Sequence, residues 1–314
     1  MTPFSHVAWL AICLCISFSG KITADAPITA IAFAPDGETA LVGSQSGVRL
    51  YGFPDIAIQR RIRSSLTEVG AIEFSPDGRR VAIAGGTPGE RGEVEMFAWP
   101  TMQLIDRSEG HEDSIQAIAW RDESSFATAG LDGEVLLWQC KPLKPSSSIK
   151  GHSKGVCGVS FLVDGTMLTA SIDQSLRVWK SSSLELVRTL NNHTDSIHAV
   201  HKRPRDSQAS GLPMCITISD DRTVRFWQPT IGRLVRFCRL DSVPMAVAWS
   251  RDGTRLWVCC DDGSVREIDP ETAAVIDSIP AIKGSGFAIE AVPNGRDLLV
   301  GGRSGELKRL RVSR

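Results

Sequence analysis

The sequence predicts an all-β protein in which short antiparallel strands form a closed ring of seven four-stranded blades. Three observations lead to this fold class. A segment of about forty residues recurs three times in the middle of the chain. Short apolar runs bounded by glycine and turn residues continue the same period on both sides of it. No stretch keeps a helical period over the length that a structural helix needs.

Seven segments are expected to be the first strands of the blades. They are ITAIAF ending at Phe33, VGAIEF at Phe74, IQAIAW at Trp120, VCGVSF at Phe161, IHAVHK at Lys202, PMAVAW at Trp249 and FAIEAV near Val292. Most of them are followed by an Asp-Gly or Asn-Gly turn and then by a second short apolar strand. Two insertions, Gly85 to Glu93 and Lys202 to Pro213, are expected to lengthen loops without forming another domain. Residues 21–314 are therefore expected to be one domain.

The three clear copies share four residues, and the Thr, the Asp and the Trp keep the same separations in every copy. Each copy has an opening His, then a Thr, an Asp and a Trp: His111, Thr128, Asp132 and Trp138; His152, Thr169, Asp173 and Trp179; His193, Thr217, Asp221 and Trp227. Gly110 and Gly151 precede the first two histidines, and Asn192 precedes the third. This pattern resembles the WD-repeat (WD-40) family of β-propellers. The residue after each Trp departs from the family pattern, because the usual Asp is absent.

The resemblance implies a buried hydrogen-bonded chain in each copy, in which the Trp indole donates to the Thr hydroxyl, the Thr bonds the His, and the Asp holds the His. A Thr, a His and an Asp together also suit nucleophilic catalysis. Three repetitions favour a structural role. The other four units carry Tyr51, Phe97, Ile268 and Leu310 at the Trp position and lack the opening His. We expect those units to pack through apolar contacts alone.

The N-terminal segment has the features of a signal peptide over residues 1–24. An apolar core from Val7 to Phe18 precedes small residues and is too short to span a membrane, although no Lys or Arg stands before it. The seventh unit supplies only three strands, so we expect Lys21 to Asp25 to supply the fourth. Cleavage is then expected near Ser19 or Gly20, or not at all. These features predict export to the bacterial periplasm or envelope, or secretion, with a cytoplasmic location as the alternative. The segment from Ser75 to Phe97 is similar to WD-repeat segments attached to exported bacterial cytochrome-type proteins.

Charge and cysteine content exclude several classes of function. The 35 Lys and Arg residues balance 36 Asp and Glu residues, so the chain lacks the excess positive charge of a nucleic-acid-binding domain. No C-x-x-C motif supports a zinc ribbon, a redox site or a haem attachment. Ser153 lies in a G-x-S-x-G match, but a strand follows it where the catalytic motif needs a helix. His198 and His201 are expected on opposite faces of one strand, which is unsuitable for binding one metal ion. We expect no cofactor and no metal.

The resemblance implies a non-catalytic scaffold that binds other proteins and acts as a monomer within a larger complex. Docking is expected on the face formed by the loops that join blades and the loops after each second strand. Acidic residues are expected on one sector of this face: Asp195, Asp220, Asp241, Asp261 and Asp262. Arg91 and Arg303 are expected in loops on the other side of the ring. Ordinary solvated loop charge is the alternative interpretation of these residues. The alternative function is a lactonase-like or hydrolase-like propeller enzyme with its site at the mouth of the channel.

Overall fold

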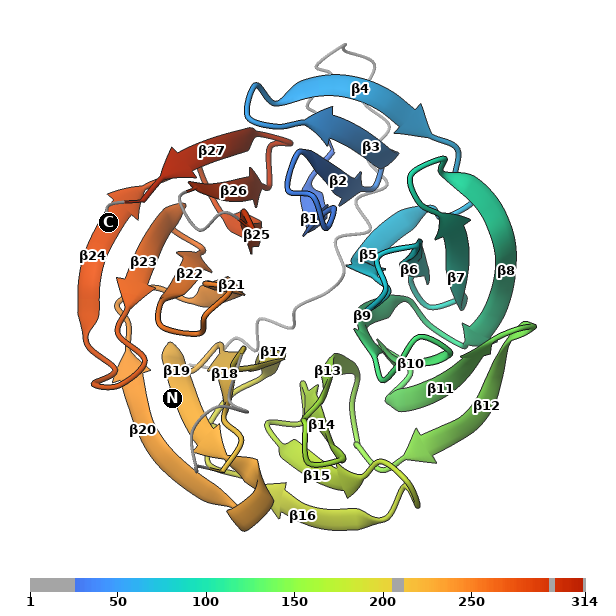
Figure 1. Cartoon of the computed structure of the whole chain (residues 1–314). Coiled ribbons are helices and arrows are strands. Elements are labelled where there is room, and N and C mark those ends of the chain that lie inside the picture. Colours follow the sequence, from blue (N-terminus) through green and yellow to red (C-terminus); the bar gives the residue numbers. More distant parts are fainter. Residues whose placement is uncertain (1–25, 205–211, 294–296, 313–314) are drawn as a thin grey trace, which may run out of the picture.

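Apolar segments that end in a large side chain form the innermost strands, and the chain runs outward from each of them through one sheet. The computed structural model describes residues 26–204, 212–293 and 297–312. Within those ranges seven antiparallel sheets stand around a central axis as the blades of a ring (Figure 1). The predicted all-β propeller of seven blades is confirmed.

The first four blades each contain four strands in chain order. Blade one has β1 (Ile28–Phe33), β2 (Thr39–Ser44), β3 (Gly47–Gly52) and β4 (Ala57–Ile62). Blade two has β5 (Glu68–Phe74), β6 (Arg80–Thr87), β7 (Arg91–Ala98) and β8 (Gln103–His111). Blade three has β9 (Ile115–Trp120), β10 (Ser125–Gly130), β11 (Glu134–Cys140) and β12 (Leu143–Lys150). Blade four has β13 (Val156–Phe161), β14 (Thr166–Ser171), β15 (Leu176–Lys180) and β16 (Leu186–Leu190).

The last three blades continue the same order. Blade five has β17 (Ile197–Lys202), β18 (Cys215–Ser219), β19 (Thr223–Gln228), the short 3-10 helix η2 (Pro229–Ile231) and β20 (Arg233–Arg239). Blade six has β21 (Pro244–Trp249), β22 (Leu256–Cys260), β23 (Ser264–Ile268) and β24 (Val275–Pro280). Blade seven has β25 (Gly286–Ala291), β26 (Asp297–Gly302) and β27 (Leu307–Arg311).

Tight turns reverse the chain after the innermost strands. In blade two the Asp77 carboxylate accepts hydrogen bonds from the Ser75 hydroxyl (2.6 Å) and from the Arg79 N–H (3.1 Å). Gly78 takes a left-handed conformation with φ of 67°, which glycine adopts without steric cost. The sequence Ser-x-Asp-Gly therefore supplies both the hydrogen bonds and the backbone freedom that the turn needs.

The hydrophobic core lies between neighbouring blades. Val94 and Met96 of blade two share one cluster with Trp120 and Phe126 of blade three. The adjacent residues Cys259 and Cys260 enter clusters on opposite faces of β22, as predicted from the alternation of a strand. Among the described cysteines, Cys140, Cys157, Cys238, Cys259 and Cys260 carry free thiols. Each blade is therefore stabilised by its two neighbours.

The expectation that four units pack through apolar contacts alone is wrong for blades two, six and seven. In blade six the buried Glu267 carboxylate accepts two hydrogen bonds from Arg255 (2.7 and 3.0 Å). In blade seven Asp297 accepts two from Arg309, both at 3.0 Å. In blade two the Ser65 hydroxyl donates to Glu95 (2.8 Å). Glu267 and Asp297 are satisfied by local donors in place of the His, Thr and Trp of the repeat, whereas Oε2 of Glu95 is buried without a hydrogen-bond partner among the described residues.

Two further expectations are corrected or lie outside the described residues. The segment Gly85 to Glu93 lengthens a hairpin more than a loop, because Gly85 pairs with Glu93 and Thr87 with Arg91 across β6 and β7. The signal peptide over residues 1–24, its cleavage site and the strand Lys21 to Asp25 lie outside the described residues. So does most of the second insertion, residues 205–211.

Candidate functional site

One end of the ring is formed by two kinds of loop that bond to each other. The loops that join blades and the loops between the second and third strands meet through backbone hydrogen bonds. Examples are Leu131 N–H to Ser114 O (3.0 Å), Ile172 N–H to Gly155 O (3.0 Å) and Asp220 N–H to Ser196 O (3.0 Å). We call this end the loop face.

A buried hydrogen-bonded chain lies beneath the loop face in blade three. The Trp138 indole N–H donates to the Thr128 hydroxyl oxygen at 2.7 Å. His111 Nε2 lies 2.7 Å from the same oxygen, and His111 Nδ1 lies 2.9 Å from Asp132 Oδ2. The residues come from the end of β8, from β10, from the loop after it and from β11.

Blades four and five contain the same chain. The Trp179 and Trp227 indoles donate to Thr169 and Thr217, both at 2.9 Å. His152 Nε2 lies 2.7 Å from the Thr169 oxygen, and His193 Nε2 lies 2.6 Å from the Thr217 oxygen. The Nδ1 atoms of the two histidines lie 3.0 and 2.8 Å from their partner carboxylates, which belong to Asp173 and Asp221.

The Asp and Thr partners of each histidine determine which of its ring nitrogens carries a proton. A carboxylate can only accept, so each histidine Nδ1 must carry a proton and donate it. In the neutral ring Nε2 is then an acceptor, and the Thr hydroxyl donates to it while accepting from the Trp indole. Burial lowers the pKa of His193 below its ordinary value, against the opposing effect of Asp221. The polar side-chain atoms of the His, the Thr and the Trp in each hydrogen-bonded chain thereby all have partners.

Each aspartate of the chains also ties the two kinds of loop together. Asp173 accepts from the backbone N–H groups of Ser153 and Ser175, both at 3.0 Å. Asp221 accepts from those of Thr194 (3.2 Å) and Thr223 (2.9 Å). Burial alone would raise the pKa of the Asp173 carboxyl, but its hydrogen bonds from His152 and Ser175 and from the Ser153 N–H outweigh burial and hold the pKa well below its usual range. The carboxylates therefore stay charged and hold the loops in place.

The chains do not form nucleophilic sites. Thr128, Thr169 and Thr217 have no exposed surface, so a substrate cannot reach their hydroxyl groups. Ser153 is exposed, but both nitrogens of His152 are bonded to Thr169 and Asp173, which leaves Ser153 without a general base. The Thr, His and Asp pattern is structural here.

Most carboxylates of the expected acidic sector have hydrogen-bond donors beside them. Asp241 and Asp262 both accept from Arg266, at 2.5 and 2.9 Å. Asp220 accepts from His198 Nε2 (2.7 Å), and Asp261 accepts from the Val243 N–H (2.9 Å). Local donors therefore bond four of the five carboxylates, and Arg266 supplies one positive charge among them.

The other candidate partner-binding residues differ in their surroundings. Asp195 is exposed on the loop that joins blades four and five. Arg303 is exposed in the turn after β26. Arg91 begins β7 and is not in a loop, and it pairs with Glu93 at 2.8 Å and with Glu109 at 3.7 Å. The charge of Arg91 is therefore balanced within blade two.

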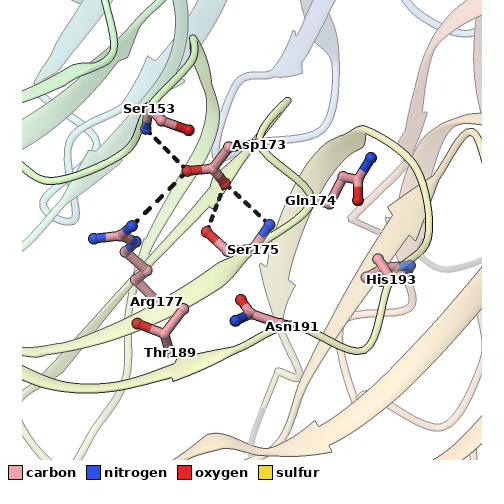
Figure 2. Close-up of a pocket in the computed structure, with 8 residues that line it drawn as sticks. All are labelled: Ser153, Asp173, Gln174, Ser175, Arg177, Thr189, Asn191 and His193. Atoms are coloured by element: carbon pink, nitrogen blue, oxygen red, sulfur yellow. Dashed lines mark hydrogen bonds and ion pairs between the residues drawn. The ribbon is translucent and has the colours of Figure 1, made fainter.

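A polar pocket of about 310 Å³ opens on the loop face between blades four and five. Figure 2 shows Ser153, Ser175 and Arg177 around Asp173, with Gln174 and His193 on the side away from Arg177. Thr189 and Asn191 complete the lining. The sequence reasoning missed this pocket. A signal was present, since an Arg stands two residues before the Trp position in blades four, five and six.

Comparison with known families supports the repeat assignment. Residues 102–139, 143–180 and 184–228 match the WD domain, G-beta repeat family. Each matched segment contains the outer strand of one blade and the three inner strands of the next. The chain is a WD-repeat β-propeller. No curated protein matches the chain.

The offset between repeat and blade explains the position of the histidines in this WD-repeat propeller. Each opening His follows an outer strand and bonds to the next blade, so a single sequence repeat joins two blades. His198 and His201 lie apart from these chains on β17, and no group of three or more His, Cys, Asp or Glu side chains in the described ranges is arranged to hold a metal ion. In the same ranges no helix has the length and apolar character to cross a membrane.

Proposed function

We propose that this WD-repeat propeller is a non-catalytic scaffold that binds another protein through its loop face. One observation carries the proposal. In three consecutive blades a buried aspartate fixes a blade-joining loop to the neighbouring loop. A surface that is rigid before binding loses little conformational entropy when it binds. The propeller therefore offers an ordered surface for a partner, and the polar pocket lies within it.

We further propose that the protein acts outside the cytoplasm, as a monomer within a larger complex. The apolar segment from Val7 to Phe18 and the small residues after it support export. Fractionation of native cells with an antibody against the chain tests this location. Recovery only in the cytoplasmic fraction would contradict it.

The experiment for the scaffold compares two sets of charge reversals on the same protein. Three exposed loop-face residues are reversed in one variant: Glu112→Lys, Asp195→Lys and Arg303→Glu. Three exposed residues of the turns on the opposite end are reversed in the control variant: Glu38→Lys, Glu123→Lys and Arg251→Glu. Both sets change the net charge by the same amount, so a general effect of charge on association is cancelled.

The partner is first identified by affinity purification from native cells and is then purified. We expect the loop-face variant to bind this partner at least tenfold more weakly, and the control variant to bind it as the wild type does. Equal melting temperatures show that both variants are folded. Loss of binding in the control variant alone would place the docking surface on the other end of the ring.

The enzyme alternative makes a different prediction. A lactonase-like or hydrolase-like propeller would bind a metal ion at the mouth of the channel. Elemental analysis of the protein purified without chelators distinguishes the two functions. Stoichiometric calcium or zinc would favour the enzyme over the scaffold.

A further inference from the structure

An arginine occupies the same position in three consecutive blades of the propeller. Arg177, Arg225 and Arg266 lie on β15, β19 and β23, the third strands of blades four, five and six. Arg177 pairs in register with Thr169 and Arg225 with Thr217. Each arginine also follows, four residues later, the aspartate of the loop before it. The three side chains therefore rise toward the loop face from equivalent places.

Two of the three guanidinium groups donate hydrogen bonds to nearby carboxylates. Arg225 donates from Nε to the Thr223 hydroxyl (3.0 Å) and from Nη2 to Asp221 (3.2 Å), and it lies over the Phe237 ring. Arg266 donates to Ser242 and to the carboxylates of Asp241 and Asp262. Each of these two guanidinium groups therefore has a carboxylate partner within hydrogen-bonding distance.

Arg177 differs from both. Its closest carboxylate oxygen, Asp173 Oδ2, lies 4.0 Å from Nη2, which is beyond hydrogen-bonding distance. Its Nε atom is buried and has no hydrogen-bond partner within the described part of the chain. The side chain is only 20% exposed, so bulk water replaces the missing partners poorly. A partly buried cation whose donors lack partners is stabilised when a hydrogen-bond acceptor binds to it.

The pocket beside Arg177 has the size and the lining to supply that acceptor from outside. Its volume of about 310 Å³ compares with about 30 Å³ for one molecule of liquid water, so it holds several heavy atoms. The Asn191 amide and the Ser153 hydroxyl add neutral donors to its wall. The planar guanidinium can bind a carboxylate through two parallel hydrogen bonds.

The charge of Asp173 restricts the kind of anion. Its carboxylate is held by His152, Ser153 and Ser175 and remains in the pocket wall. It repels a second negative charge more strongly when that charge is a phosphate dianion than when it is a carboxylate monoanion. The lining therefore favours a carboxylate over a phosphate.

We propose that Arg177 and its pocket bind the carboxylate side chain of an Asp or Glu residue of the partner protein. This inference rests on the proposed scaffold function and adds the chemistry of the contact. The bidentate pair with Arg177 orients the partner on the seam between blades four and five. Arg225, in the next blade, is not given this role because it already donates to the Asp221 carboxylate and the Thr223 hydroxyl.

The test uses the full chain, labelled with ¹⁵N, and small probes that carry one side chain each. Blocked glutamate (N-acetyl-glutamate amide) is titrated at pH 7.5 and constant ionic strength. Blocked glutamine is the neutral control of the same shape, and blocked phosphoserine is the dianionic probe. The readouts are the Arg177 Nε–Hε signal and the Asn191 side-chain amide signal in NMR spectra. The Arg177→Gln variant identifies the first signal by its loss.

We expect blocked glutamate to shift both signals in a saturable manner with a millimolar dissociation constant. Blocked glutamine is expected to shift neither, and blocked phosphoserine to bind more weakly. In Arg177→Gln the Asn191 response should vanish, whereas the matched Arg225→Gln variant should keep it. No response to glutamate, an equal response to glutamine, or tighter binding of phosphoserine would overturn the proposal.

The same variants separate this inference from the scaffold itself. If the loop-face variant loses the purified partner but Arg177→Gln binds it as the wild type does, the scaffold stands and the carboxylate contact is wrong. If neither variant loses the partner, docking on the loop face is itself wrong. If Arg177→Gln weakens binding at least tenfold and Arg225→Gln does not, both are supported. Melting temperatures of the two glutamine variants control for folding.

Discussion

A buried tryptophan in this protein fills space between two blades and also satisfies a threonine. Trp179 packs in the cluster between blades three and four and donates to Thr169. Trp179→Ala opens a cavity and removes the indole donor, so we expect the free energy of unfolding to fall by about 3 kcal/mol or more. Urea unfolding followed by intrinsic fluorescence measures the change. A loss below about 1 kcal/mol would show that the site relaxes around the cavity.

A second residue-scale prediction concerns a carboxyl group on an innermost strand. Glu73 of β5 is half-buried, and its Oε2 atom is enclosed with no hydrogen-bond partner in the described ranges. Burial raises the pKa of the Glu73 carboxyl to about 8, against the charge of Lys202 and a hydrogen bond from the Trp120 backbone. The folded state therefore holds a proton that the unfolded state loses near its ordinary pKa of about 4.3. Stability should then fall as the pH rises from about 4.5 to 8.

Glu73→Gln removes this dependence because the amide has no proton to lose. We expect the variant to be more stable than the wild type at pH 8, by on the order of 1 kcal/mol after allowance for partial solvent contact, and equal to it at pH 4. Thermal melts across this pH range measure the difference. The exposed Glu123→Gln is the matched control and should show no gain. A gain for Glu73→Gln that does not vary with pH would refute the titration argument.

At the scale of single residues, the hydrogen-bonded chains could be predicted from the sequence, but the bonds of the charged residues around them could not. The Thr, Asp and Trp residues recur at fixed separations behind an opening His, and this repetition marks them as a geometric unit. The bond from Arg266 to Asp241 could not be predicted, because Asp241 lies in a blade-joining loop that meets Arg266 only in the folded ring. The lack of a hydrogen-bond partner for Arg177 Nε could not be predicted either, because it depends on which groups meet in the folded ring.

At the scale of elements, blades five and six stabilise the same position in different ways. Asp221 has a 2% exposed side chain and bonds to His193, to two backbone N–H groups and to Arg225. Asp262 has a 42% exposed side chain, and its partner Arg266 keeps Asp241 and Ser242 when Asp262 is removed. In blade six, several side chains therefore make the contacts that depend on a single aspartate in blade five.

We expect Asp221→Ala to lower the free energy of unfolding by about 3 kcal/mol, because it strips a buried histidine and an arginine of their partner. Asp262→Ala should cost less than about 1 kcal/mol. Denaturant melts of the two variants make the comparison directly. Equal losses would mean that blade six depends on its aspartate as blade five does.

Strands were predictable where apolar runs alternate with turn residues, and less so where glycine is frequent. The segment from Gly85 to Glu93 has the composition of a loop, yet its residues extend β6 and β7 by continued pairing. Cross-strand hydrogen bonds use the backbone and do not depend on side chains, so composition cannot reveal them. The polar pairs of Glu267 with Arg255 and of Asp297 with Arg309 both span twelve residues, but the acidic and the basic partner exchange places between the two blades, so no repeated residue type marked them.

At the scale of the whole molecule, the ring closes between blade seven and blade one. In the described ranges β27 is the outer strand of a three-stranded sheet, whereas the other six sheets have four strands. We propose that residues Lys21 to Asp25 supply the missing strand, since an unpaired edge leaves backbone groups without partners. A chain beginning at Pro27 should then melt several degrees below a chain beginning at Gly20. Equal melting temperatures, or a mature protein that begins at Pro27, would contradict this closure.

Partner binding on the loop face is the central claim for the intact protein, and hydrogen exchange tests it most directly. Amide exchange is measured by mass spectrometry for the full chain alone and with its purified partner. We expect protection in the loops around residues 112–114, 151–155 and 191–196, and in the loop around Gln174, with little change in the turns at the opposite end. Protection confined to those turns or to the outer strands would contradict the proposed docking surface.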